Sequence, residues 1–145
     1  MKNISIFMYD LNLGGTEKVM VNLANYLTAQ GFIITILLVA DNRYLEKELL
    51  PQIKVVSFKR KRIFQSFIPL ICYIYSNKID VLIANVWPLT IVAIAAGFSR
   101  PGFNRKALLV EHCHLEREFS DHSSVFKFFQ KLSIKYFYPK SFKVI

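Results

Sequence analysis

Short apolar runs alternate along this chain with stretches of helical periodicity, and the alternation restricts the fold more than any other feature. Strands are predicted, in chain order, over Ile4–Met8, Phe32–Ala40, Ile53–Phe58, Asp80–Ala84 and Ala107–Glu111, with a sixth beginning at Phe142–Ile145. Helices are predicted between them over Thr16–Gln30, Arg43–Leu50, Ile63–Asn77, Pro88–Gly97 and Ser123–Tyr138. Such alternation builds right-handed βαβ units. The sequence therefore predicts one α/β domain over residues 1–145, a Rossmann-like doubly wound parallel sheet flanked by helices.

The apolar pattern also predicts which faces are buried. Phe32–Ala40 is apolar throughout, as expected of a parallel strand that is covered on both faces. The first helix carries a stripe formed by Val19, Leu23 and Leu27, joined by Met20 and Ala24. Gly31 directly follows this helix and is expected to cap its carboxyl end. Cys72 lies in an apolar run and is expected to be a small buried hydrophobe.

Two apolar segments resemble membrane spans but are better explained as buried elements. Ile63–Tyr75 is shorter than the roughly 20 residues that a bilayer requires. Val81–Phe98 is interrupted by polar residues and a proline, which favours a strand followed by a helix. No secretory signal is visible, and Cys72 and Cys113 form no paired motif, so a reducing compartment is expected. We expect the protein to be cytoplasmic, with peripheral attachment to the cytoplasmic face of a membrane.

The formal net charge of +9 favours anionic partners. The strongest basic run is Lys59, Arg60, Lys61 and Arg62, which directly precedes the apolar segment that begins at Ile63. A basic cluster beside apolar residues suits an anionic membrane surface, while the alternative is a solvated loop that leads into a core helix. Aromatic residues are spread through the predicted core rather than grouped for base stacking, so no nucleic-acid partner is expected.

Gly14 and Gly15 stand at the first strand-to-helix turn. A helix N-terminus has unpaired N–H groups, and glycine lets a phosphate or sugar approach them, so a phosphate- or sugar-facing loop is one interpretation. A tight turn with no ligand is the other. The spacing is neither G-x-G-x-x-G nor that of a P-loop. Asp41 ends the second strand, where a ribose-binding acid would lie in a nicotinamide-dependent oxidoreductase, but the missing glycine spacing disfavours that function.

Ligands of open parallel sheets bind at the carboxyl ends of the strands. This rule gathers four turns at one edge, namely Tyr9–Gly15, Ala40–Arg43, Asn85–Pro88 and His112–Glu118. The last turn belongs to the densest polar cluster, Glu111-His112-Cys113-His114-x-Glu116-x-Glu118. Three interpretations remain open for it: an imidazole that contacts a sugar or phosphate, a solvated loop, or a metal site. No second group of ligands stands out elsewhere, so a metal is the least favoured of the three interpretations, and no cofactor is expected.

The segment Gly14-Gly15-Thr16-Glu17-Lys18-Val19, followed by Asn22-Leu23-Ala24, resembles the G-G-[AT]-E-[KR]-V…N-L-A signature of family-4 glycosyltransferases of the GT-B fold. Asp80–Asn85 and Glu111-His112 also fall where that family carries its fourth-strand segment and its histidine after strand five. The similarity extends along this chain but covers only the N-terminal, acceptor-side domain of the family.

The resemblance implies one half of a retaining glycosyltransferase. Such an enzyme transfers a sugar from a nucleotide-sugar to a glycan or lipid-linked acceptor, as in lipopolysaccharide or capsule synthesis, without a metal ion. The C-terminal donor-binding domain lies outside these 145 residues, so we expect this chain to be truncated and to transfer no sugar alone. A non-catalytic, basic, membrane-associated module is the alternative.

The resemblance also implies roles for individual residues. Gly14, Gly15 and Thr16 would face the donor diphosphate, and His112 rather than His114 would contact the donor sugar. Candidates on the acceptor side are Asn85, Trp87, Glu111 and His114. Lys59, Arg60, Lys61 and Arg62 are the candidates that face the membrane. No residue of this chain is assigned as catalytic.

Overall fold

The structure, a computed structural model, describes residues 2–110, 135–136 and 143–144. Its strands are β1 (Asn3–Met8), β2 (Ile33–Leu38), β3 (Lys54–Ser57), β4 (Val81–Asn85), β5 (Ala107–Val110) and β6 (Lys143–Val144). The α-helices within the described residues are α1 (Gly15–Ala29), α2 (Phe67–Ser76) and α3 (Leu89–Gly97). Short 3₁₀ helices precede β3, α2 and β5, namely η1 (Tyr44–Glu48), η2 (Ile63–Ser66) and η3 (Phe103–Lys106).

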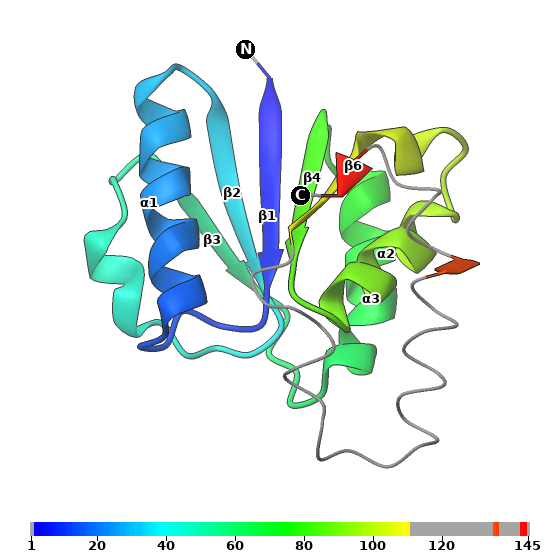
Figure 1. Cartoon of the computed structure of the whole chain (residues 1–145), viewed down its shortest axis with the longest axis horizontal. Helices are drawn as coiled ribbons and strands as arrows, with labels where there is room; N and C mark the ends of the chain where they lie inside the picture. The colour runs from blue at the N-terminus through cyan, green and yellow to red at the C-terminus, as the bar shows by residue number, and fades with distance from the viewer. Residues whose placement is uncertain (1, 111–134, 137–142, 145) are drawn as a thin grey trace.

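The six strands form one parallel sheet in the order β3-β2-β1-β4-β5-β6 (Figure 1). This is the strand order of doubly wound nucleotide-binding sheets, and the order reverses between β1 and β4. The predicted α/β class, with a parallel sheet flanked by helices, is therefore confirmed. The chain reaches β4 by crossing from the β3 edge to the other side of β1.

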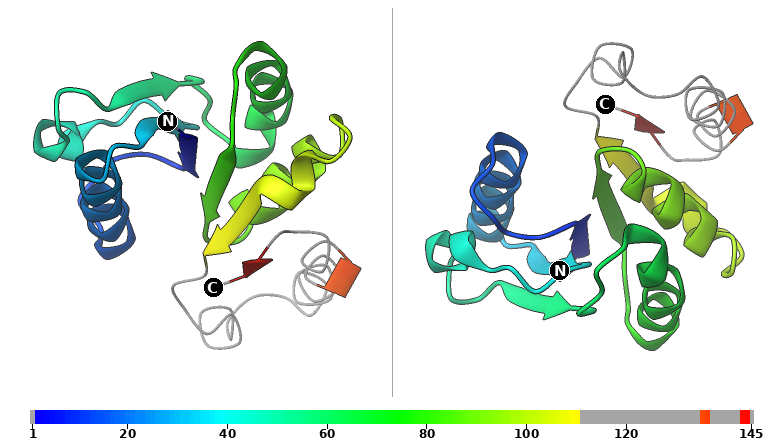
Figure 2. Two further views of the ribbon diagram at one scale, coloured as in Figure 1. Left: turned by 90° about the horizontal axis from the view of Figure 1, so that it is seen from above. Right: turned by 90° about the horizontal axis from the view of Figure 1, so that it is seen from below.

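Helices cover both faces of the sheet, α1 on one face and α2 with α3 on the other (Figure 2). Each face of the sheet has its own hydrophobic core, and alternate residues of β1 point into the two cores. Ile6 packs on the α1 side and Phe7 on the α2 and α3 side, and both side chains are fully buried. β2 follows the same alternation, with Ile36 and Leu37 on opposite faces. The prediction that the second strand is buried on both faces is confirmed.

Two of the predicted helices contain 3₁₀ helix in place of α-helix. The predicted helix over 63–77 begins as η2, and its α-helical part starts at Phe67. Pro69 lacks the N–H that a helix interior requires, and this start places it in the first turn of α2, where no such bond is needed. The predicted helix over 43–50 is the shorter 3₁₀ helix η1, and Pro51 disfavours a helical conformation at the residue before it, so the helix ends ahead of Leu50.

Two predictions of burial are wrong. Val19 is 49% exposed, because α1 turns Met20, Val21 and Ala24 toward the sheet. Cys72 is exposed, because the buried positions of α2 are Leu70 and Ile74, and a residue midway between them lies on the opposite side of the helix. Gly31 has a φ of 86° after α1, which confirms its predicted role at the end of that helix.

The segment predicted as a strand and a helix over 81–98 is β4 followed by α3. No helix among the described residues is long and apolar enough to cross a membrane. Of the predicted helix over 123–138, residues 135–136 are described and are helical. Of the predicted strand over 142–145, residues 143–144 pair with β5.

Asp80 connects the amino ends of two neighbouring strands. Its Oδ2 accepts a hydrogen bond from the backbone N–H of Asn3 at 2.9 Å. This bond is the main cause that holds the pKa of Asp80 below its ordinary value of 3.8, and nearby lysines act in the same direction. The folded-state pKa is lower than the unfolded-state pKa. The carboxylate therefore stabilises the fold at pH values above its ordinary pKa, and this stabilisation is lost as the pH falls through the folded-state pKa.

Asp80→Asn should therefore lower the melting temperature at neutral pH, since a neutral amide accepts a weaker hydrogen bond than a carboxylate. The difference from the unaltered protein should shrink as the pH falls below the ordinary carboxyl value of 3.8 and through the lower folded-state pKa. Thermal unfolding followed by circular dichroism across this pH range measures both quantities. A difference that stays constant with pH would contradict the electrostatic explanation.

Candidate functional site

The turns that follow β1, β2, β3 and β4 lie at one edge of the sheet, at the bottom of Figure 1. Parallel pairing of all these strands brings their carboxyl ends together there. Three of the predicted ligand turns, over 9–15, 40–43 and 85–88, belong to this edge. The turn after β3, which was not among the predicted ones, belongs to it as well.

Asp10 joins the loop after β1 to the loop after β2. Its side chain is buried, with Oδ1 accepting from the N–H of Asn12 at 3.1 Å and Oδ2 accepting from Nδ2 of Asn42 at 3.0 Å. The N–H of Leu11 also donates to the carbonyl of Asn42 at 2.9 Å. Sequence reasoning missed Asp10, although an acidic residue directly after a buried strand is a signal that could have identified it.

Gly14 and Gly15 form the start of α1, and neither has the left-handed conformation that favours glycine. Gly14 has a φ of −151°, which any residue adopts, and no positive φ occurs at Gly15. A Cβ added to Gly15 would meet no atom within 4 Å. Backbone geometry therefore does not require glycine at position 15, and the space beside it is open. No side chain caps the start of α1, so its first N–H groups keep hydrogen-bonding capacity for a ligand.

Glu17 shares this helix start. A Cβ on Gly14 would collide with the Glu17 carboxylate, which therefore lies against the N-terminal turn. A carboxylate in the first turn is favoured by the partial positive charge there. An anionic ligand at α1 would approach from the side of Gly15 and Thr16, because the Gly14 side is covered by Glu17.

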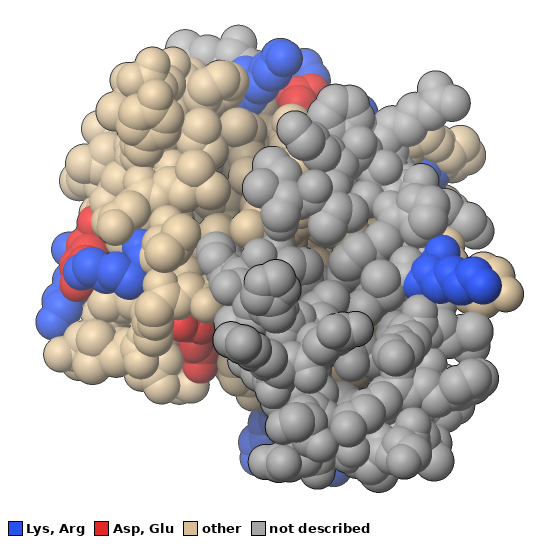
Figure 3. Space-filling view, viewed as in Figure 1, with Lys and Arg blue, Asp and Glu red and all other residues tan. Residues whose placement is uncertain are grey.

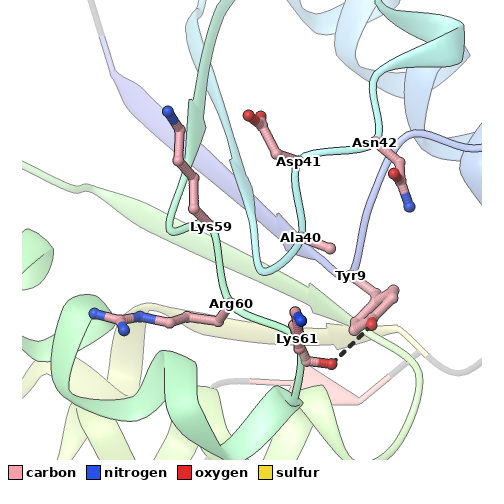
Figure 4. A pocket seen from close by; sticks show the side chains of 7 residues that line it. All are labelled: Tyr9, Ala40, Asp41, Asn42, Lys59, Arg60 and Lys61. Carbon is pink, nitrogen blue, oxygen red and sulfur yellow. Dashed lines mark hydrogen bonds between the residues drawn. The ribbon is translucent and has the colours of Figure 1, made fainter.

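A pocket of about 390 Å³ lies at the carboxyl ends of β1, β2 and β3 (Figure 4). Its lining residues are Tyr9, Ala40, Asp41, Asn42, Lys59, Arg60 and Lys61. Three residues of the basic run, which was predicted to face a membrane, thus line a pocket at the ligand edge. The phenolic hydroxyl of Tyr9 donates to the carbonyl of Lys61 at 3.0 Å and connects two walls of the pocket.

Asp41 is the carboxylate of this pocket. Its Oδ1 accepts from Nε of Arg43 at 2.6 Å. This hydrogen bond is the main cause that holds the pKa of Asp41 below its ordinary value of 3.8, and the charge of Lys59 acts in the same direction. Asp41 is therefore ionised at neutral pH. Its side chain keeps an exposure of 39%, so ligand hydroxyls can reach it.

The basic run is exposed along its whole length. Within the part of the chain that the structure describes, none of its four side chains forms a salt bridge. Lys59 has a φ of 53°, which is uncommon for a residue with a side chain. The N–H of Arg62 donates to Oε1 of Gln65 at 3.2 Å, so the last residue of the run leads into η2.

Two large apolar side chains stand beside the run without being buried. Phe64 is 68% exposed and Ile68 is 63% exposed, and they are four residues apart across the join of η2 and α2. The face in Figure 3 shows charged side chains in scattered groups between uncharged ones. The described Lys and Arg side chains are therefore not concentrated on that face, and attraction to an anionic surface would depend on the local run and its apolar neighbours.

Asn85 and Trp87, predicted on the acceptor side, lie at the end of β4 and just after it, across the switch point from the glycine turn. Asn85 is 2% exposed, and its Oδ1 has no hydrogen-bond partner within the described structure. A buried carbonyl oxygen without a donor costs free energy, and a ligand hydroxyl could supply that donor. Trp87 is half-buried.

Glu111, His112 and His114 lie outside the described residues, as does the whole turn over 112–118. Their predicted roles stay predictions. Among the residues that are described, no group of three or more His, Cys, Asp and Glu side chains could hold a metal ion. Comparison with models of protein families and with curated proteins gives no match for this chain.

Proposed function

We propose that this chain is the acceptor-binding half of a glycosyltransferase, which transfers a sugar from a nucleotide-sugar to a glycan or lipid-linked acceptor. The observation that carries the proposal is the open, uncapped start of α1 at Gly15, beside the point where the strand order reverses. The backbone does not require glycine there, and the space beside it lets a ligand approach the first N–H groups of the helix. This supports the family resemblance of the G-G-T-E-K-V segment.

In this proposal the donor diphosphate lies against the N–H groups at Gly15 and Thr16, where the helix dipole favours negative charge. Asn85 lies across the switch point and offers its unpaired Oδ1 to an acceptor hydroxyl. His112 remains the proposed contact to the donor sugar. The nucleotide-sugar is a substrate, and no metal ion is part of the proposal.

A second candidate function, a basic module that binds membranes without catalysis, is favoured by one observation. Phe64 and Ile68 are exposed beside four cations that form no salt bridge within the described chain. Apolar side chains can enter the interface of a bilayer while lysine and arginine remain at the anionic headgroups. The two functions are compatible, because a transferase that uses lipid-linked acceptors works at the cytoplasmic surface of a membrane.

Binding of nucleotide-sugars tests the first function directly. The chain is titrated with UDP-sugars and GDP-sugars, and the backbone amide resonances of residues 14–17 are followed by NMR. We expect these amides to shift with the diphosphate ligands and to stay unchanged with uridine and guanosine, which lack phosphate. Absence of shifts with every member of the panel in a folded sample would contradict the proposal.

Sugar transfer is the corresponding catalytic measurement. A full-length relative that carries this domain together with a donor-binding domain is incubated with radiolabelled nucleotide-sugars and a membrane lipid extract, and label in the lipid or glycan fraction is counted. Label above the background of a boiled sample is expected for at least one donor.

A further inference from the structure

The pocket at the carboxyl ends of β1, β2 and β3 is lined by charged residues that have no role in the proposed donor site. We propose that it binds a phosphorylated polyol, with the phosphate against the Lys59–Lys61 segment and the polyol hydroxyls against Asp41. Its role as the acceptor subsite rests on the function proposed above. Binding of the ligand class itself does not, because the charged groups that it uses come from the loops after β2 and β3 and not from the start of α1.

The charges of the lining residues indicate a phosphate. Lys59, Arg60 and Lys61 supply three cations, and Asp41 is the one carboxylate among the lining residues. Arg43, on the same loop as Asp41, already pairs with that carboxylate. The three lining cations form no salt bridge within the described residues, so they retain their charge for a ligand. Charge-assisted hydrogen bonds from lysine and arginine are among the stronger contacts that a phosphate can form.

The carboxylate indicates hydroxyls beside that phosphate. An ionised carboxylate is an acceptor only, so Asp41 attracts O–H donors and repels a second anionic group. In Figure 4, Asp41 and Lys59 extend toward the same side from facing loops, whereas Arg60 extends away from Asp41. One phosphate beside neutral hydroxyls fits this arrangement better than a diphosphate does. A volume of about 390 Å³ is near the lower end of the range for ligand pockets, which suits a small headgroup.

The segment that carries the cations is held in place by backbone contacts. The N–H of Arg60 donates to the carbonyl of Val39 at 2.7 Å, and the carbonyl of Lys61 accepts from Tyr9. Lys59 is kept in its left-handed conformation while its N–H donates to Oγ of Ser57 at 3.1 Å. A segment ordered in advance loses less conformational entropy when a ligand binds.

The test is a titration of the chain with sn-glycerol 3-phosphate, followed through the amide resonances of residues 41–42 and 59–61. The double variant Lys59→Gln/Lys61→Gln should weaken binding by about tenfold or more. A matched control is Lys54→Gln/Lys78→Gln, which removes the same charge from exposed lysines at the amino edge of the sheet and should leave the affinity within about twofold. Equal weakening by both pairs, or no shift at these amides, would overturn the proposal.

The variant Asp41→Asn distinguishes the contribution of the polyol hydroxyls to binding from that of the phosphate. The unaltered chain should bind glycerol 3-phosphate more tightly than inorganic phosphate, and the variant should lose this preference while binding inorganic phosphate at least as well. Loss of affinity for both probes to the same extent would overturn the assignment of Asp41 to the hydroxyls. Nucleotide-sugar binding is followed at the amides of residues 14–17, and polyol phosphate binding at those of residues 41–42 and 59–61. The two proposals can therefore fail independently of each other.

A free polyol phosphate and a phospholipid headgroup share this chemistry. Vesicles of phosphatidylglycerol in phosphatidylcholine are added to the complex with glycerol 3-phosphate. Displacement of the soluble ligand, as seen at the amides of residues 59–61, identifies a lipid headgroup as the source. Retention of the soluble ligand identifies a free phosphate ester.

Discussion

In a full-length relative that carries this domain, Gly15→Val is expected to lower sugar transfer by roughly a hundredfold, which corresponds to a loss of about 2.7 kcal/mol of transition-state stabilisation. The branched side chain would occupy the open space beside the start of α1, where the donor diphosphate is proposed to approach. The same change should abolish the shifts of the amides of residues 14–17 in the isolated chain. The transfer rates of the unaltered and the Gly15→Val proteins are measured with a saturating acceptor and a labelled nucleotide-sugar.

The control is Ala29→Val, which places the same side chain at the exposed last residue of α1. It should leave transfer and nucleotide binding nearly unchanged. Since Gly15 has an ordinary φ and no neighbour in reach of a new Cβ, the Gly15→Val protein should fold. Near-normal transfer by a folded Gly15→Val protein would mean that the glycine turn contacts no donor.

Replacement of Lys59, Arg60, Lys61 and Arg62 by glutamine is expected to weaken binding to anionic vesicles by roughly a hundredfold or more, since each cation near such a surface contributes about 1 kcal/mol. Sedimentation with phosphatidylglycerol vesicles measures the effect. Increasing salt should weaken binding of the unaltered protein in the same direction. Equal binding of both proteins to anionic and neutral vesicles would rule out electrostatic attachment.

A second variant distinguishes binding to the membrane from binding of a soluble ligand in the pocket. Phe64→Ser/Ile68→Ser removes the exposed apolar pair without changing any charge. Vesicle binding should fall, while the affinity for soluble glycerol 3-phosphate should remain that of the unaltered chain. If the two side chains instead pack against the hydrophobic core, the variant would lower the melting temperature and leave the vesicle affinity unchanged.

The sequence predicts the main features of the fold because hydrophobic periodicity is dictated by burial. The alternation of apolar runs and helical stretches identifies β1 to β5 and the helices between them, with small shifts at their ends. Local backbone chemistry explains the errors: Pro69 postpones the start of α2, and Pro51 limits η1. The exposure of Cys72 depends on which face of α2 meets the sheet, and a helix that is apolar all round does not reveal that face.

The candidate site was less predictable than the fold. The glycine turn and the turn after β4 could be placed at the ligand edge because they follow clear strands. The basic run was interpreted through its charge, and its position directly after β3 was overlooked, so its place in the pocket became visible only in three dimensions. Asp10 was missed because hydrogen bonds to Asn12 and Asn42 depend on two loops that meet only after folding.

The central position of β1 has a consequence during synthesis. The first strand to leave the ribosome, Asn3–Met8, can pair with β2 once Ile33–Leu38 has also emerged, but its other edge must wait for Val81–Asn85. In that interval the nascent chain presents an apolar strand with an open edge, which is a template for pairing with other chains. This edge of β1 is closed only when β4 pairs with it.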